Sequence, residues 1–371
     1  MNWEVLVVGG GKIGRMVAVI LQNAAEYNVT IADANQEMLD EVAALGIATI
    51  KVDVGDEAQL LKALDGKNAV LSATPYFLTP AIASAAKKAR AHYFDLTEDV
   101  KSTKFVMDLA QGADSAFMPQ CGLAPGFVGI AGYHLAKEFD SIEDLSMRVG
   151  ALPRYPTNAL KYNLTWSTEG LVNEYCNPCE ALVDGKLKEV EPLENLENFS
   201  LEGVDYEAFN TSGGLGTLCD TLAGRAKNVS YRSIRYPGHR DILNILLNDL
   251  KLNKRQDLMC EIFENGLPRT RQDVVTVFCT ATGMINGRFE ERSFVNVSKA
   301  MEVAGKSWSA IQITTAAGVT AAIDLMRLGR LPQAGFVRQE QIDLDEFLAN
   351  RFGALYLGQE FATKSVTPKA A

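Results

Sequence analysis

The first third of the chain alternates short apolar runs with longer amphipathic stretches. Residues 3–8 form an apolar run that predicts a buried strand, residues 15–24 carry apolar positions at helical spacing, and residues 28–32 form a second apolar run. The alternation continues to residue 118, so the pattern predicts six strands separated by helices. The remaining predicted strands are 47–53, 68–73, 92–96 and 115–118, and the remaining predicted helices are 56–64, 78–90 and 101–111.

Short strands that alternate with helices are typical of an α/β fold, with a doubly wound parallel sheet covered by helices on both faces. The pattern changes after residue 122, where strand-like alternation becomes less regular, which predicts a second α/β domain with a mixed sheet. We expect a first domain over 1–122, the second over 123–308, and a helical segment over 309–371 that packs back on the first domain and frays after residue 358. In the second domain we expect a helix at 127–138, strands at 145–149, 161–166, 230–235 and 274–281, and polar connections such as the acidic stretch 189–207.

A glycine loop, GGGKIG at residues 9–14, joins the first predicted strand to the first predicted helix. A bare G-x-G-x-x-G is weak evidence, but Asp33 ends the next strand about 20 residues on, which is the context of a dinucleotide-binding Rossmann domain. Gly9 allows a tight turn, Gly11 lets the backbone approach a pyrophosphate, and Gly14 lets helix and strand pack closely. The N–H groups that begin the helix would then face the phosphates. The alternative is a glycine-rich turn that binds nothing.

Asp33 also bears on which dinucleotide is bound. A carboxylate at the end of the second strand accepts hydrogen bonds from both adenosine ribose hydroxyls and repels a 2′-phosphate. Its chain neighbours are Ala32, Ala34 and Asn35, with no arginine to neutralise such a phosphate. The sequence therefore favours NAD over NADP as cofactor. Asp33 is also placed to cap the next helix, and both roles are compatible.

Ligands of doubly wound sheets bind beyond the carboxyl ends of the strands. Asp53 ends the third strand, where it contacts adenine or caps the following helix. Small residues end the fourth strand and let the cofactor approach, and Tyr76 after them either walls a substrate pocket or belongs to the core. The expected cofactor contacts are Gly9, Gly11, Lys12, Ile13, Gly14, Asp33, Asp53, Val54, Ala73, Thr74, Pro75, Leu123 and Pro125.

Three carboxylates cluster where the fifth strand ends, in the segment Asp95-Leu96-Thr97-Glu98-Asp99. Asp95 or Glu98 would give a cationic substrate its counter-charge, and a carboxylate in a desolvated pocket acts as a base. The alternative is a capping arrangement in which Thr97 or Asp99 opens the following helix.

The second domain carries two polar segments that suit a carboxylate ligand. The loop at 209–217 offers Asn210, Thr211 and many backbone N–H groups. Further on, three arginines and a histidine fall within nine residues, 232–240, of an acidic protein. Arg235 is a natural fork for a carboxylate, and His239 titrates in the range needed for proton transfer near neutrality. Surface salt bridges are the alternative role for the arginines.

Composition narrows the partners. The formal charge is −10, from 36 basic and 46 acidic residues, and no long basic run is present, so we expect neither nucleic acid nor an anionic membrane surface as partner. The longest apolar stretch, residues 310–326, is interrupted by polar side chains and predicts a core helix.

We see no secretory signal and expect six free thiols and a cytoplasmic protein. Cys176 and Cys179 form a C-x-x-C without a second pair, so we expect no metal site.

Several blocks of the chain resemble the saccharopine dehydrogenase-like family, and the resemblance spans nearly the whole chain. The blocks are GGGKIG at 9–14, YFDLTEDV at 93–100, PQCGLAPG at 119–126, NALKYNLTWS at 158–167, FNTSGG at 209–214, IRYPGH at 234–239 and GFVRQE at 335–340. The resemblance is strongest to lysine-oxidising bacterial members. It implies a two-domain fold with the active site in the cleft between the domains, a second domain for substrate binding and oligomerisation, and a homodimer or higher homo-oligomer.

The resemblance further implies oxidation of the ε-amine of L-lysine by NAD to 2-amino-6-oxohexanoate, which cyclises to a piperideine carboxylate, with NADH and ammonia as the other products. The residues are compatible with this: Arg235 with the Asn210–Thr211 loop would hold the carboxylate, Asp95 or Glu98 would face an ammonium, and His239 or Asp95 would be the base. The alternative is a glutamate-forming saccharopine dehydrogenase, for whose extra carboxylates Lys161 and Arg154 supply cations. A catalytically silent NAD-binding sensor is a further alternative.

Overall fold

The computed structural model describes residues 2–359, and their contacts divide the chain into two compact units. Unit 1 comprises the described residues of Met1–Gly122, Glu302–Ser307 and Gln312–Ala371, and unit 2 comprises Leu123–Met301 and Trp308–Ile311. The first division falls at Gly122, where the hydrophobic pattern changes. The tail expected to fray after residue 358 lies almost wholly outside the described residues.

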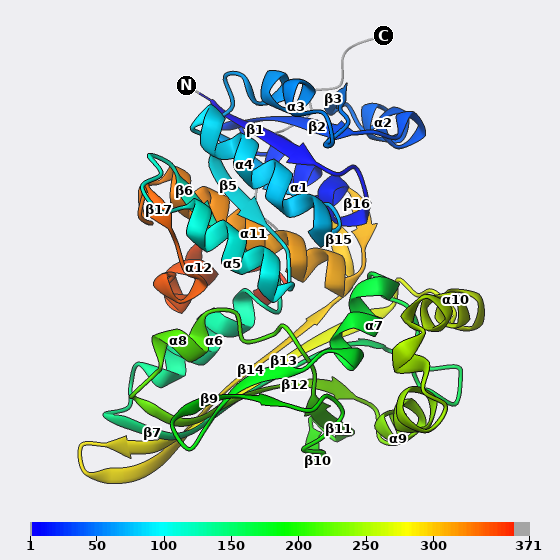
Figure 1. The fold of residues 1–371 in the computed structure, drawn as a ribbon, viewed down its shortest axis with the longest axis vertical. Coiled ribbons are helices and arrows are strands. Elements are labelled where there is room, and N and C mark those ends of the chain that lie inside the picture. Colours follow the sequence, from blue (N-terminus) through cyan, green and yellow to red (C-terminus); the bar gives the residue numbers. More distant parts are fainter. Residues whose placement is uncertain (1, 360–371) are drawn as a thin grey trace. The chain divides into compact units, whose positions relative to one another are not determined.

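Within residues 2–359, unit 1 contains a parallel sheet of seven strands in the order β17-β6-β5-β4-β1-β2-β3 (Figure 1). Strand β1 lies between β4 and β2, so the chain reverses its direction of winding beside β1, and ligands bind at such a switch point. The six predicted strands are confirmed, and the two-residue β17 is too short to give a periodic signal. The strands are β1 (Trp3–Val8), β2 (Tyr27–Asp33), β3 (Ala48–Lys51), β4 (Ala69–Ser72), β5 (His92–Asp95), β6 (Ala116–Met118) and β17 (Gly335–Phe336).

The helices of unit 1 follow the strands as the pattern predicted. One apolar core forms where Leu60, Ile82 and Val106, from three successive helices, pack on the strands. Side-chain caps explain where several helices begin: Asn35, Asp56 and Asp99 each accept hydrogen bonds from the first turn of the helix that follows. The helices are α1 (Lys12–Gln22), α2 (Gln36–Ala43), α3 (Glu57–Leu64), α4 (Thr79–Ala89), α5 (Val100–Leu109), α11 (Ala310–Arg327) and α12 (Leu344–Ala349).

A buried carboxylate joins the C-terminal part of unit 1 to its sheet. Asp324 on α11 accepts hydrogen bonds from Tyr27 of β2 at 2.6 Å, from Asn350 at 2.9 Å, and from Arg327 and Arg351 at 2.9 and 3.1 Å. Because every partner donates to the charged form, these bonds hold the pKa of Asp324 below its ordinary value although burial acts the other way. Helix α11 is a buried core helix, as its interrupted apolar run predicted.

Unit 2 is organised around a mixed sheet, which in the described residues has eight strands: β10-β11-β12-β7-β13-β14 in order, with β8 on β12 and β9 on β8. Strands β7 and β12 are parallel and the other neighbours are antiparallel. The strands are β7 (Ser141–Pro153), β8 (Cys179–Val183), β9 (Lys186–Val190), β10 (Glu197–Leu201), β11 (Val204–Asn210), β12 (Ala226–Arg235), β13 (Asp273–Ile285) and β14 (Arg288–Lys299). A separate hairpin of β15 (Met301–Val303) and β16 (Lys306–Trp308) belongs mostly to unit 1.

Helices α7 (Thr168–Cys176), α9 (His239–Asn244) and α10 (Gln256–Gly266) gather at one end of this sheet (Figure 1). Tyr175, Leu243 and Phe263 from these helices share an apolar cluster with Tyr162 and Phe209. This cluster encloses the polar groups described below. The helices of unit 2 are α6 (Phe127–Ala136), α7 (Thr168–Cys176), α8 (Leu218–Thr221), α9 (His239–Asn244) and α10 (Gln256–Gly266).

Two predictions for unit 2 were wrong. Residues 161–166 are not a strand: they form an irregular segment with one isolated bridge, Leu164 to Arg269, and their alternation arises because Tyr162 and Leu164 point into the helical cluster. The acidic stretch 189–207 is not a simple connection, because it contains β10 and most of β11. Asn198, Ser200 and Asp205 are exposed while Phe199 and Leu201 pack on a small core, so a polar composition concealed a strand pattern.

Candidate active site

The loop between β1 and α1 depends on glycines because the packing leaves no room for side chains. Gly9 has φ +108°, and a Cβ there would lie 2.5 Å from the carbonyl oxygen of Ala73 at the end of β4. A Cβ on Gly14 would lie 1.9 Å from the carbonyl oxygen of Gly9. Beside Gly11, in contrast, the space is open, and this residue caps α1 without a side-chain hydrogen bond. The loop therefore offers helix N–H groups and space for a phosphate.

Asp33 fixes this loop to the end of β2. Its Oδ2 accepts a hydrogen bond from the Gly10 N–H at 2.7 Å, and its Oδ1 accepts one from the Asn35 N–H at 2.8 Å. Asn35, and not Asp33, caps α2, so the capping alternative for Asp33 is wrong. The carboxylate has further lone pairs for two ribose hydroxyls.

The fold brings an arginine, Arg15, close to the glycine loop. The sequence around Asp33 contains no arginine and so did not predict it. Arg15 on α1 donates from Nε to the carbonyl oxygen of Gly10 at 2.7 Å and pairs with Glu41. Its positive charge is therefore already balanced within unit 1. A 2′-phosphate at Asp33 would have to compete with Glu41 for this guanidinium.

The ends of β3 and β4 carry the other expected cofactor residues of unit 1. Asp53 is exposed and closes a turn by accepting a hydrogen bond from the Gly55 N–H at 2.8 Å, while Asp56 caps α3. Ala73 lies against Gly9, and Thr74 is hydrogen-bonded to the hydroxyl of Ser72 at 3.0 Å. Val54 packs against the core, and Pro75 precedes the short helix Tyr76–Leu78, whose Tyr76 is half exposed.

Asp95 ends β5 with its side chain only 1% exposed. Its Oδ1 accepts hydrogen bonds from the N–H groups of Gln120 at 2.8 Å and Thr97 at 3.0 Å, and its Oδ2 accepts one from Tyr93 at 2.8 Å. Burial raises the pKa of Asp95 to about 6, and the three hydrogen bonds act against that rise. The carboxylate holds Gln120, which has a left-handed backbone with φ +64°, beside the strand end. Its assignment as base or ammonium ligand stays a prediction.

Of the two neighbouring acids, Asp99 has the capping role, and the role of Glu98 stays a prediction. Asp99 caps α5, accepting hydrogen bonds at 2.7 Å from the N–H and the hydroxyl of Ser102. Glu98 is half-buried, and burial raises its pKa above the ordinary value, with the charge of Asp99 adding to the rise. A carboxyl group whose pKa is raised toward neutrality is suited to acid–base chemistry.

In unit 2 the structure brings Arg235 and His239 together through a tyrosine on α7. Arg235 donates from Nε to the Tyr175 hydroxyl at 2.8 Å, and this hydroxyl lies 3.2 Å from His239 Nε2. His239 Nδ1 lies 2.8 Å from the carbonyl oxygen of Leu160, which only accepts, so Nδ1 carries the proton and Nε2 accepts from Tyr175. The four groups form one directed chain of hydrogen bonds.

Burial keeps His239 neutral although its hydrogen bond to Leu160 acts the other way. The ring is 2% exposed, and burial, together with the nearby charge of Arg235, lowers the pKa of His239 to about 3. Both ring nitrogens are engaged, so the ring orients Tyr175 and, through it, Arg235. Its role as proton acceptor for a substrate stays a prediction.

Arg235 is a buried cation, 3% exposed. Its guanidinium lies over the rings of Tyr162 at 5.1 Å and Tyr175 at 5.5 Å. Besides the bond to Tyr175, Nη1 donates to the carbonyl oxygen of Ile234 at 2.8 Å, and Nη2 lies 3.8 Å from Oε2 of the buried Glu174. In the part of the chain that the structure describes, the Arg235 side chain donates these two hydrogen bonds, and its guanidinium carries further N–H groups that could bind an anion.

A second carboxylate builds the turn that carries His239. Glu207 on β11 is the register partner of Arg235, and its two oxygens accept hydrogen bonds from the N–H groups of Gly238 at 2.8 Å and Arg240 at 2.6 Å. The start of α9 is therefore occupied by a side chain of the protein itself. Glu207 therefore positions the turn.

The residues expected to line the 209–217 loop are engaged with their surroundings. Asn210 donates to the carbonyl oxygen of Glu191 at 3.2 Å, and the Thr211 hydroxyl lies 2.8 Å from that of Ser233. Both side chains are buried, as are Leu123 and Pro125 at the start of unit 2. For Asn210 and Thr211 the structure gives a role in holding the loop, and ligand contact stays a prediction.

Sequence reasoning missed three residues that surround Arg235: Glu174, Tyr175 and Glu207. Ser167 followed by apolar residues at helical spacing, 171, 172 and 175, was the available signal for α7. Glu207 carried no such signal, because its role depends on the antiparallel register of β11 and β12.

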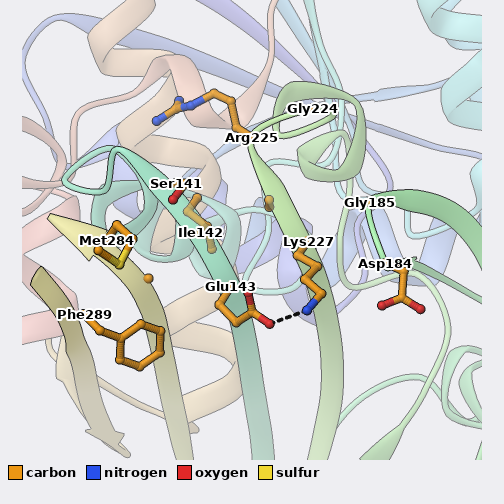
Figure 2. A pocket seen from close by; sticks show the side chains of 12 residues that line it. Ser141, Ile142, Glu143, Asp184, Gly185, Gly224, Arg225, Lys227, Met284 and Phe289 are labelled. Atoms are coloured by element: carbon orange, nitrogen blue, oxygen red, sulfur yellow. Dashed lines mark hydrogen bonds and ion pairs between the residues drawn. The ribbon is translucent and has the colours of Figure 1, made fainter. Parts of the chain in front are cut away.

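Unit 2 also contains a surface hollow of about 440 Å³ at the opposite end of β12 (Figure 2). Lys227 and Glu143 in it pair with each other at 2.6 Å, and Arg225 and Phe289 lie along its edge. Because side chains of both charges line it, the hollow does not define a class of ligand.

Residues 2–359 contain neither a candidate metal cluster nor a candidate membrane span. No cluster of three histidine, cysteine or acidic side chains there could hold a metal ion. None of the helices there is long and apolar enough to cross a membrane. All six cysteines are free thiols.

Comparison with known families covers both units. The saccharopine dehydrogenase NADP binding domain family matches residues 5–117, and the saccharopine dehydrogenase C-terminal domain family matches residues 122–354.

Curated relatives and one solved structure agree with these matches. The chain is 24% identical over 266 residues to the mitochondrial alpha-aminoadipic semialdehyde synthase of Rattus norvegicus, covering 65% of this chain and 27% of the relative. It is 25% identical over 258 residues to the saccharopine dehydrogenase [NADP(+), L-glutamate-forming] of Schizosaccharomyces pombe, covering 66% and 57%. The L-Glu-forming saccharopine dehydrogenase of Saccharomyces cerevisiae has the same fold, with TM-score 0.79, 18% identity and coverage of 94% and 96%.

Proposed function

The chain belongs to the saccharopine dehydrogenase family, and from this premise we propose that it is an NAD-dependent L-lysine 6-dehydrogenase. The reaction takes lysine, NAD⁺ and water to 2-amino-6-oxohexanoate, ammonium, NADH and one proton. The observation that carries the proposal is the buried Arg235, whose remaining donors suit the single carboxylate of lysine. The aldehyde product then cyclises with its own α-amine to a piperideine carboxylate.

Unit 1 supports the cofactor part of the proposal. The open space at Gly11 and the uncapped start of α1 fit a pyrophosphate, and the Asp33 carboxylate fits a ribose with two free hydroxyls. Bound NAD⁺ supplies the hydride acceptor. The matched domain family and the fungal relatives are named for NADP, so the preference for NAD is specific to this proposal.

The chemistry requires the ε-ammonium to lose a proton before hydride leaves Cε, because the nitrogen lone pair must form the C=N bond of the imine. Glu98 supports this step, since its raised pKa makes it a stronger base than an ordinary glutamate. Asp95, fixed by three hydrogen bonds, holds the strand end from which the segment of Glu98 continues. After releasing that proton to solvent, the same carboxylate can take a proton from the water that attacks the imine carbon, and can return it to the nitrogen as ammonia leaves.

The test is an assay of the purified full chain with two substrates, L-lysine and saccharopine, and two cofactors, NAD⁺ and NADP⁺, by the absorbance of the reduced nicotinamide. We expect activity with L-lysine and NAD⁺, with ammonium released in equal amount. Activity with saccharopine alone would replace the proposal by its alternative. Absence of activity with either substrate would favour a silent dinucleotide-binding protein.

The variant Glu98→Gln examines the proposed base. Wild-type kcat/KM should fall as the pH falls through the raised pKa of Glu98, and the variant should be slow at every pH without that acid limb. A variant with the wild-type pH profile would remove Glu98 from the mechanism.

A glutamate-forming saccharopine dehydrogenase is the second candidate, and two observations favour it. The curated relatives in yeasts carry that name. The extra carboxylates of saccharopine would need further cations, and Lys161 is one candidate. It lies close to His239 in the chain fold, because the neighbouring Leu160 carbonyl oxygen binds His239. The Lys161 amine donates to the carbonyl oxygen of Pro237 at 2.9 Å. The substrate assay separates the two candidates directly.

A further inference from the structure

We propose that Glu41 on α2 makes the chain select NAD over NADP by occupying the guanidinium of Arg15. The inference deepens the cofactor part of the proposed function, and it rests on that proposal in taking Asp33 as the acceptor for the adenosine ribose. It does not depend on which amino acid is oxidised. Glu41 is a positioning residue, because it acts on the cofactor through Arg15.

Gly10 brings the charged groups of the glycine loop together. Its N–H donates to Asp33 Oδ2 at 2.7 Å, and its carbonyl oxygen accepts the Nε–H of Arg15 at 2.7 Å. The side chain of Met38 packs at the same place, since a Cβ on Gly10 would lie 2.9 Å from Met38 Cγ and 3.4 Å from Asp33 Oδ2. The residue that holds the ribose-binding carboxylate therefore also holds a guanidinium.

Each nitrogen of the Arg15 guanidinium has a partner in unit 1. Nε binds the carbonyl oxygen of Gly10, Nη2 contacts Sδ of Met38, and Nη1 pairs with Oε2 of Glu41. The Arg15 side chain is 24% exposed and that of Glu41 is 63% exposed, so the arginine is enclosed and the glutamate approaches it from solvent. Loss of the Glu41 carboxylate would leave the other two contacts of Arg15 in place and would free Nη1.

NADP differs from NAD by a phosphate on the 2′-oxygen of the adenosine ribose, one of the two hydroxyl oxygens that Asp33 would bind. Arginine suits such a group, because its N–H groups match phosphate oxygens in pairs. In this chain the phosphate would have to displace Glu41 to gain these donors. A ribose with a free 2′-hydroxyl needs no cation, so the Arg15–Glu41 pair weakens the binding of NADP and not that of NAD.

The experiment measures binding and needs no substrate. The full-length wild type and its variants are titrated with NADH and NADPH, which differ only in the 2′-phosphate, and the fluorescence of the reduced nicotinamide is followed. Glu41→Gln should lower the ratio of the Kd for NADPH to the Kd for NADH by about fivefold, since water screens an exposed ion pair and limits its effect. The change should come from tighter binding of NADPH, with the Kd for NADH unchanged.

Two comparisons show whether Glu41 acts through Arg15. Glu37→Gln is the matched control for the loss of one negative charge, because Glu37 is exposed on the same helix and forms no ion pair within residues 2–359. In the Arg15→Gln background, Glu41→Gln should change the ratio no more than Glu37→Gln does. A ratio of two dissociation constants does not depend on the folded fraction, so a destabilised variant still gives an answer.

Three results would overturn the proposal. An equal ratio in Glu41→Gln and Glu37→Gln would leave Glu41 as an ordinary surface charge. An undiminished effect of Glu41→Gln without Arg15 would mean that the carboxylate repels the phosphate directly, or that Lys51, the register partner of Asp33 on β3, binds it. A wild type that binds NADPH more tightly than NADH would remove the selection itself.

The same titrations separate failure of this inference from failure of the proposed function. If lysine is not oxidised but the ratio falls in Glu41→Gln and not in the Arg15→Gln background, the role of Glu41 stands and the proposed reaction is wrong. If lysine is oxidised with NAD⁺ but the ratio does not respond, the reaction stands and Glu41 has no part in selecting the cofactor. If neither nucleotide binds, both proposals are wrong.

Discussion

The neutral, buried state of His239 predicts a specific loss of stability in acid. The ring is held by the Leu160 carbonyl oxygen and the Tyr175 hydroxyl, and Arg235, Tyr162 and Tyr175 are the ionisable groups around it. Its pKa is lowered from 6.5 to about 3 in the folded chain, so the unfolded chain binds the proton more readily. The group therefore contributes stability that is fully present above pH 6.5 and is lost as the pH falls toward 3.

The size of the effect follows from linkage. Each pH unit below the unfolded pKa costs about 1.4 kcal/mol while the folded ring stays neutral, so unfolding at about pH 5 should be easier by about 2 kcal/mol. This value does not depend on the folded pKa as long as it is well below that pH. Burial of Asp95 acts in the opposite direction, because its raised pKa adds stability as the pH falls.

The assay is urea unfolding of wild type and His239→Asn between about pH 7 and pH 5, followed by circular dichroism. The variant should be less stable than the wild type at each pH, because it loses a hydrogen bond. The difference between their free energies of unfolding should shrink by about 2 kcal/mol from about pH 7 to pH 5. Groups common to both proteins, Asp95 included, cancel in the difference. Tyr175→Phe is the control: it removes the hydroxyl but keeps the buried imidazole, so its gap to wild type should not shrink in this way. A constant gap for His239→Asn would refute the neutral buried ring.

Three further predictions concern unit 1. Asp324→Asn should lower the free energy of unfolding by about 3 kcal/mol or more, because it breaks a buried network that two arginines share, whereas Asp257→Asn in an exposed pair should have a much smaller effect; equal costs by urea unfolding would contradict this. Gly14→Ala should destabilise the fold, because its Cβ would meet a carbonyl oxygen at 1.9 Å, while Gly11→Ala should keep the fold and weaken dinucleotide binding measured by calorimetry. Asp33→Ser should raise the ratio of kcat/KM for NADP⁺ over NAD⁺, because it removes the repulsion between the Asp33 carboxylate and the 2′-phosphate. Two unit charges about 4 Å apart near a protein surface interact by about 4 kcal/mol. If half of that energy is expressed in the reaction, the ratio should rise about thirtyfold. A ratio unchanged in Asp33→Ser would show that Asp33 does not select the cofactor.

The sequence determined the architecture of unit 1 because each of its elements depends on local pattern. A strand buried on both faces is a continuous apolar run, an amphipathic helix repeats about every 3.6 residues, and a side-chain cap lies next to the helix it begins. The steric need for Gly9 and Gly14 was also predictable, because a tight strand–turn–helix unit brings the same backbone atoms together wherever it occurs. The pattern was less informative in unit 2, where β10 exposes polar side chains and the buried segment around Tyr162 mimics a strand.

Only the tertiary structure decided what the polar residues do. Three acids lie close together in the sequence but differ in the structure. Asp95 accepts hydrogen bonds at both oxygens, Glu98 has a raised pKa, and Asp99 caps a helix. Arg235 and His239 were visible as candidates, but Tyr175 on a separate helix connects them. The reason is physical: strand and helix formation depends on neighbours along the chain, whereas the charge state and free donors of a buried side chain depend on which distant groups surround it.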